Sequence, residues 1–141
     1  MFAIDFETRV AKFYEDAARN DLYVNAKESF LLFADQSKKN SLVLERIYKD
    51  STASDGDVGA FTPIAGLTRS DYLVEAEMTP SVSYRDFLTL ATDIEEKASR
   101  LYLDIARQVR SQGTRIVRSF ERLAEERSSR KLTLESLLKT A

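Results

Sequence analysis

Apolar residues recur every three or four positions through four long segments of the chain, which span residues 2–19, 22–50, 84–111 and 114–139. This spacing collects the apolar side chains on one face of a helix, whereas a strand would alternate apolar and polar residues. The pattern therefore predicts four amphipathic helices. The connections between the first and second helices and between the third and fourth are short, so each pair is predicted to form an antiparallel hairpin.

Residues 51–83 differ from the rest of the chain, because they hold both prolines and three of the four glycines. They predict a crossover with one short helix near 68–77. A crossover of this length can run along a bundle and bring the third helix parallel to the second. The sequence thus predicts a single all-α domain over 1–141, with a helical hairpin at 1–50 and another at 84–141.

The two predicted hairpins repeat each other in sequence. Residues 3–19 align with 91–107 at an offset of 88, and residues 29–45 align with 119–135 at an offset of 90. The identities in the first alignment are Ala3/Ala91, Asp5/Asp93, Glu7/Glu95, Tyr14/Tyr102, Asp16/Asp104, Ala18/Ala106 and Arg19/Arg107. The repetition indicates a duplicated helical hairpin.

Composition removes several classes of function. The 141 residues carry a formal net charge of −2, which gives no global attraction for nucleic acid or for anionic membranes. The chain has no histidine and no cysteine, so Ser-His catalysis, thiol chemistry and most zinc sites are excluded. Acidic residues near the start argue against a secretory signal, and no long apolar run predicts a membrane span. We expect a cytoplasmic protein that binds neither nucleic acid nor membrane.

Two Glu–Tyr pairs stand at matched positions of the repeat: Glu7 with Tyr14, and Glu95 with Tyr102. Each pair is two helical turns apart and lies on one helical face. With the duplication and the long crossover, these pairs resemble the rubrerythrin-type members of the ferritin-like superfamily, over essentially the whole chain. The resemblance implies a ferritin-like four-helix bundle and a homodimer. In that family a Glu-x-x-His motif follows on the next helix of each half, and the four helices together hold two irons.

Both Glu-x-x-His motifs are absent here. The matching positions hold Ser37-Lys38-Lys39-Asn40 on the second predicted helix and Arg127-Ser128-Ser129-Arg130 on the fourth. A further carboxylate that the family often places three residues after Glu95 is Ala98. By this resemblance the chain retains two carboxylate ligands of a di-iron site and has no nitrogen ligand.

Helical geometry places the two arginines independently of any family. At 100° per residue, Arg127 and Arg130 fall within the narrow apolar stripe of the fourth helix. Unpaired buried charges cost several kcal/mol, so Glu7 and Glu95 are the expected partners. We predict a core salt-bridge network in place of the metals. The side chains expected to complete its hydrogen bonds are Ser37, Asn40 and one or both of the hydroxyls of Tyr14 and Tyr102.

Two functional hypotheses follow. The first is a non-catalytic binding or assembly protein with no cofactor and an unknown protein partner. The second is an iron-binding oxidoreductase or iron-handling protein with an all-oxygen site, in which Glu7 and Glu95 recruit Asp35, Glu96 or Glu126. The simpler alternatives are that the glutamates are surface residues and that the arginines extend into solvent. The basic excess over 107–131 is interpreted as a solvated face rather than as a site for an anionic partner.

Overall fold

The computed structural model describes residues 2–53 and 82–141. Four long α-helices dominate these ranges: α1 (Phe2–Ala18), α2 (Lys27–Ala53), α4 (Tyr84–Gln108) and α5 (Thr114–Thr140). No strand occurs in the described ranges, so the predicted all-α class is confirmed there. The predicted crossover and its short helix near 68–77 lie almost entirely outside the described residues. None of the helices within them is long and apolar enough to cross a membrane.

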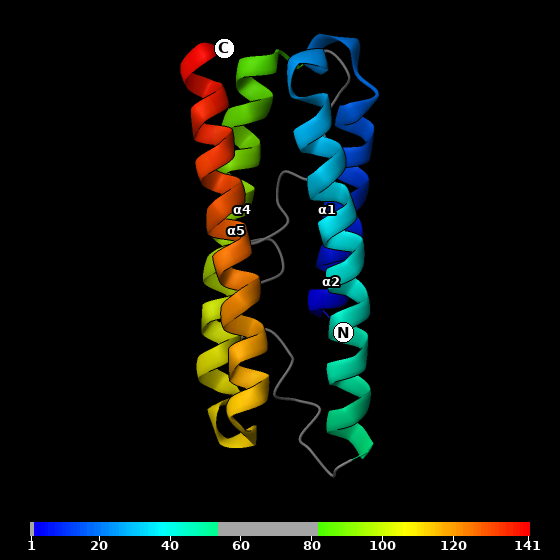
Figure 1. Ribbon diagram of the computed structural model, residues 1–141, viewed down its shortest axis with the longest axis vertical. Helices are drawn as coiled ribbons and strands as arrows, with labels where there is room; N and C mark the ends of the chain where they lie inside the picture. Colours follow the sequence, from blue (N-terminus) through cyan, green and yellow to red (C-terminus); the bar gives the residue numbers. More distant parts are fainter. Residues whose placement is uncertain (1, 54–81) are drawn as a thin grey trace.

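The helices form two antiparallel hairpins that lie side by side (Figure 1). Most contacts between helices are within the pairs α1/α2 and α4/α5. In Figure 1, α2 and α4 both run downward while α1 and α5 run upward, so α2 and α4 are parallel. This places one face of each hairpin against the other, and the site described below lies between them.

Two short 3₁₀ helices complete the hairpin connections. One covers Asp21–Ala26, and the Asn20 side chain caps it by accepting a hydrogen bond from the Leu22 backbone N–H at 2.9 Å. The second predicted helix therefore begins at Lys27 rather than at residue 22, because Tyr23 has a non-helical backbone (φ −112°, ψ 23°). The other 3₁₀ helix, Arg110–Gln112, ends α4 earlier than expected.

The core is aromatic at one end and charged in the middle. Ring contacts join Phe13, Tyr23, Phe30 and Phe87 near the α1–α2 connection, with centroids 4.7 to 6.4 Å apart. The two largest fully buried side chains in the described ranges are not apolar. They are Arg127 and Arg130, which are 0% and 1% exposed. Their burial defines the candidate site.

Candidate functional site

Glu7 on α1 and Glu95 on α4 are both fully buried and face each other across the two hairpins. Each carboxylate accepts a hydrogen bond from the tyrosine of the opposite hairpin. The Tyr102 hydroxyl donates to Glu7 Oε1 and the Tyr14 hydroxyl donates to Glu95 Oε1, both at 2.6 Å. The contacts are therefore reciprocal between the positions that the sequence alignment matches.

Arg127 lies between these carboxylates and binds both. Its Nη1 donates to the two oxygens of Glu95 at 2.9 and 2.8 Å. Its Nη2 donates to both oxygens of Glu7, with a distance of 2.5 Å to Oε2, and lies 3.4 Å from Ser37 Oγ. One guanidinium from α5 thus bridges two carboxylates from α1 and α4, because its two terminal nitrogens point to different partners.

Arg130, one turn further along α5, links the network to α2. Its Nη1 donates to Ser37 Oγ at 3.0 Å and lies 3.4 Å from Glu95 Oε1. Its Nε donates to Gln36 Oε1 at 2.9 Å, and its Nη2 donates to Glu126 Oε1 at 3.1 Å. All three nitrogens of this guanidinium therefore have acceptors, and most of them are neutral or only partly buried groups.

The outer part of the network contains one more polar pair. The Asn40 side-chain amide donates to Glu126 Oε1 at 2.6 Å, and the Glu126 side chain is 30% exposed. Glu126 thus forms a partly solvated rim next to the buried centre. The four fully buried charges, two carboxylates and two guanidiniums, sum to zero, which is the condition for keeping them ionised in the core.

Burial and charge act in opposite directions on the ionisable groups. Burial alone would raise the pKa of the Glu95 carboxyl, but Arg127, then Arg130, and hydrogen bonds from Arg127 and Tyr14 lower it below its usual range. Burial also disfavours the charged form of Arg127, but Glu7 and Glu95 raise its pKa well above the usual value. Both partners are consequently ionised at neutral pH.

The two tyrosines, unlike Glu95 and Arg127, are held in their neutral form. Burial raises the pKa of Tyr14, and the negative charge of Glu95 raises it further. Burial and Glu7 raise the pKa of Tyr102 in the same manner. Both phenols therefore remain protonated and act as fixed hydrogen-bond donors to the carboxylates.

An aromatic ring lies against each of the two guanidiniums. The Arg127 guanidinium carbon lies 5.6 Å from the centre of the Phe6 ring, and that of Arg130 lies 5.5 Å from the centre of the Phe33 ring. Contacts of this kind stabilise a desolvated cation. Arg127 Nε is the one buried guanidinium N–H of the pair without a hydrogen-bond partner among the described residues.

The predicted ion pairs are present, and neither arginine extends into solvent. Glu7, Glu95 and Ser37 are buried at the centre, together with both tyrosines. Asn40 is also buried, but it bonds to Glu126 rather than to the central charges. The sequence interpretation did not include Gln36, and it named Glu126 only as a possible metal ligand.

A di-iron centre does not fit these residues. The guanidinium of Arg127 fills the space between the two carboxylates that would have to hold the metals, and two cations there would repel a third. The carboxylates of the all-oxygen alternative have other surroundings: Asp35 is exposed, Glu96 pairs with Lys131 at 3.4 Å, and Glu126 bonds to Arg130. Within residues 2–53 and 82–141, no group of three or more acidic side chains is arranged to hold a metal ion.

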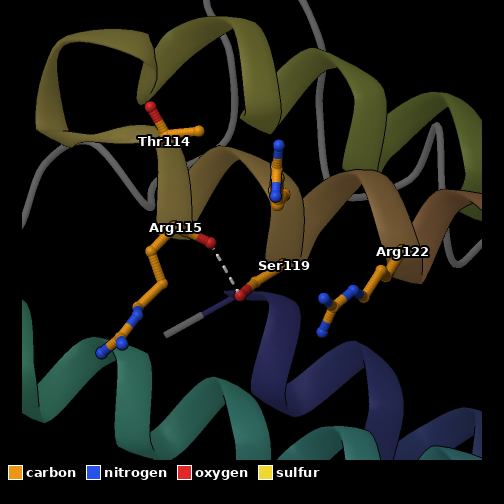
Figure 2. Close-up of a pocket in the computed structure, with 5 residues that line it drawn as sticks. Thr114, Arg115, Ser119 and Arg122 are labelled. Carbon is orange, nitrogen blue, oxygen red and sulfur yellow. Dashed lines mark hydrogen bonds between the residues drawn. The ribbon is translucent and has the colours of Figure 1, made fainter.

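A second feature is a surface hollow of about 400 Å³ at the start of α5, lined by Thr114, Arg115, Arg118, Ser119 and Arg122. Figure 2 shows Arg115 and Arg122 on either side of Ser119, whose hydroxyl donates to the Arg115 carbonyl at 3.0 Å. These three arginines are exposed. The basic excess over 107–131 therefore divides into an outer group and the two buried arginines of the core.

Comparisons of the chain with protein-family models, with curated proteins and with solved structures found no match. The functional interpretation consequently rests on the geometry of the network.

Proposed function

We propose that this chain is a ferritin-like bundle of the rubrerythrin-related group in which a salt-bridge network replaces the di-iron site. In this proposal it is a cytoplasmic, non-catalytic binding or assembly protein. The observation that carries the proposal is the position of Arg127, which bridges two carboxylates contributed by matched positions of the two hairpins. A guanidinium at this place supplies positive charge between the carboxylates, as metal ions would.

The reciprocal tyrosines support the same interpretation. A salt bridge needs only one carboxylate, yet the chain buries two at matched positions and gives each a tyrosine from the opposite hairpin. A duplicated site that once held a symmetric pair of ligands accounts for this arrangement. A helical bundle without such a history has no need for two buried carboxylates, because each costs several kcal/mol to desolvate.

Iron reconstitution tests the proposal. We expect no stoichiometric iron after aerobic or anaerobic incubation with Fe(II), removal of unbound metal and elemental analysis. Binding of about two irons per chain, the stoichiometry of the di-iron bundles, would overturn the proposal and favour the all-oxygen alternative.

A matched variant makes the test informative in both directions. The substitutions Ser37→Glu, Asn40→His, Arg127→Glu and Arg130→His place a Glu-x-x-His motif on both α2 and α5. If the network stands where metals would, this variant should gain iron while the wild-type chain does not. A variant that folds, as judged by circular dichroism, and still binds no iron would contradict the ferritin-like assignment.

A further inference from the structure

The outward face of α2 carries four exposed, large apolar side chains in two adjacent pairs. Leu31 and Leu32 are 44% and 55% exposed, and Leu42 and Val43 are 66% and 45% exposed. The pairs are 11 residues apart, which is close to three helical turns, so they lie on the same face. Four charged residues continue this face, and all are exposed: Glu28, Asp35, Lys39 and Arg46. We refer to these eight residues as the α2 stripe.

The chemistry of the α2 stripe is symmetric about residue 37. If two copies of α2 lie antiparallel around a two-fold axis at that residue, position i of one copy faces position 74 − i of the other. Each acid then faces a base: Glu28 faces Arg46, and Asp35 faces Lys39. Leucine or valine faces leucine in the two remaining pairs, Leu31/Val43 and Leu32/Leu42.

We propose that the α2 stripe is the contact surface between two copies of this chain, packed antiparallel through α2. A two-fold interface must be complementary to itself, which is the property that the stripe has. A parallel arrangement would place each position against its own copy, so Asp35 would face Asp35 and Lys39 would face Lys39. The charge pattern therefore selects the antiparallel arrangement.

The spacing along the stripe fits direct packing of two helices. Positions 28, 32, 35, 39, 42 and 46 are separated alternately by four and three residues, which is the spacing of a coiled-coil seam. Leu31 and Val43 flank that seam. From position 28 to 46 the contact would extend along about 27 Å of helix, at 1.5 Å per residue. The seam thus includes two apolar layers and charged layers on either side of each.

The corresponding face of α5 shows that the pattern is specific to α2. The offset of 90 from the sequence alignment, extended by one residue at each end, matches the eight stripe positions with Arg118, Glu121, Arg122, Glu125, Ser129, Leu132, Thr133 and Ser136. All eight are exposed, but only Leu132 is apolar. The α5 face also lacks the acid-base symmetry, since Glu125 would face Ser129 and Glu121 would face Thr133. One hairpin thus has a surface suited to self-association and its counterpart does not.

The charges of the stripe are available for an intermolecular contact. Glu28, Asp35, Lys39 and Arg46 form no ion pair with any of the residues that the structure describes. By contrast, the neighbouring Lys38 pairs with Glu15 of α1 at 3.0 Å. This interface does not depend on the proposed function, because the stripe lies on the surface of α2 opposite to the buried network.

Charge reversal in the 141-residue chain tests both the contact and its register. Sedimentation velocity over a concentration series should show a dimer for the wild-type protein. Asp35→Lys alone and Lys39→Asp alone should each weaken dimerisation by at least about tenfold, because each places like charges opposite each other twice. An equimolar mixture of the two variants should form heterodimers, since every reversed charge then meets its opposite. The double variant Asp35→Lys/Lys39→Asp should again form homodimers.

The matched control is Glu125→Lys, which makes the same charge change at the α5 position that the alignment matches with Asp35. It should leave dimerisation unchanged, and circular dichroism should show the same helix content for all variants. A wild-type chain that remains monomeric throughout the concentration series would overturn the proposal. So would a dimer that neither charge reversal weakens, or single variants that fail to associate when mixed.

Discussion

The two hairpins contribute the same groups from one helix and different groups from the other. On α1 and α4, the buried Glu and Tyr stand at matched positions and make equivalent hydrogen bonds. On α2 and α5, the matched positions diverge: Gln36, Ser37 and Asn40 are neutral, whereas Glu126, Arg127 and Arg130 are charged. A symmetric pair of negative charges is thus balanced by two positive charges from a single helix.

The divergence is complementary rather than arbitrary. Two arginines on α5 bring more donors than the two carboxylates can accept, and α2 supplies the additional acceptors. Ser37 Oγ accepts from Arg130 at 3.0 Å, and Gln36 Oε1 accepts from its Nε at 2.9 Å. A cation at position 37 as well would add unbalanced positive charge to the core. The two arginines of α5 therefore require neutral hydrogen-bond acceptors at the matched positions of α2.

The largest predicted effect on stability is at Arg127, the charged residue of the matched pair Ser37/Arg127. Arg127→Leu should lower the free energy of unfolding by about 3 to 5 kcal/mol, because it strands Glu7 and Glu95 next to each other in the core. Ser37→Ala, the same truncation test at the matched neutral position, should cost about 1.5 kcal/mol for its hydrogen bonds to charged groups. Urea unfolding followed by circular dichroism measures both values.

Two further measurements separate loss of a partner from loss of volume. A double-mutant cycle between Glu95 and Arg127 should show strong coupling, and a coupling near zero would contradict the network. Replacing Glu7, Glu95, Arg127 and Arg130 together with apolar residues of similar size should cost less than Arg127→Leu alone, because no buried charge is then left unpaired.

The pH dependence of stability should show both shifts in pKa. The pKa of Glu95 is lowered on folding, so its contribution is complete above the ordinary carboxyl value of about 4.3 and is lost as pH falls toward the folded value. The pKa values of Tyr14 and Tyr102 are raised, so their contribution is complete below about pH 10 and is lost above it. Urea titrations across both ranges measure these losses.

The acid range has a matched pair of controls. Glu95→Gln should flatten the decline of stability below about pH 4.3, because the group that responds to protonation is gone. Glu96→Gln, at the adjacent exposed position, should leave the decline as it is in the wild-type protein. Equal slopes for the wild-type protein and Glu95→Gln would show that this carboxylate does not carry the linkage.

Periodicity was sufficient to predict the four long helices that the structure describes. The apolar spacing located α4 and α5 to within a few residues, since apolar residues recur at helical spacing along both, and Ser83 caps α4 by accepting from the Asp86 backbone N–H. It placed the start of the second helix too early. Residues 21–26 have helix-like apolar spacing, but the Asn20 cap and the non-helical Tyr23 set a 3₁₀ helix instead.

The centre of the site was also predictable, because a charge within an apolar stripe requires an opposite charge inside the core. Arg127 and Arg130 identified Glu7 and Glu95 in this way. The rim was not predictable by the same argument. Gln36 lies at the edge of the buried face of α2 and reaches Arg130 through its long side chain. Glu126 is partly exposed. The i, i+4 spacing of Glu126 and Arg130 was the one available sequence signal for the rim.

The finest test of the comparison concerns the two tyrosines, whose positions match but whose carboxylates do not have equal support. Glu7 accepts from Arg127 and Tyr102, whereas Glu95 accepts from Arg127, Tyr14 and, at 3.4 Å, Arg130. Removal of the phenol should therefore cost more at Glu7. Tyr102→Phe should fall in the upper part of the range of about 1.5 to 3 kcal/mol for hydrogen bonds to charged groups, and Tyr14→Phe in the lower part.

Tyr23→Phe provides the reference for a phenol that donates to a neutral acceptor, the Val82 carbonyl at 2.6 Å, and should cost about 1 kcal/mol. Urea unfolding of the three variants under identical conditions gives the ranking. Equal costs for Tyr102→Phe and Tyr14→Phe would mean that Arg130 contributes nothing at Glu95, so that the second arginine serves only its contacts with α2 and the rim. A larger cost for Tyr14→Phe would mean that Glu95, rather than Glu7, is the carboxylate that depends more on its tyrosine.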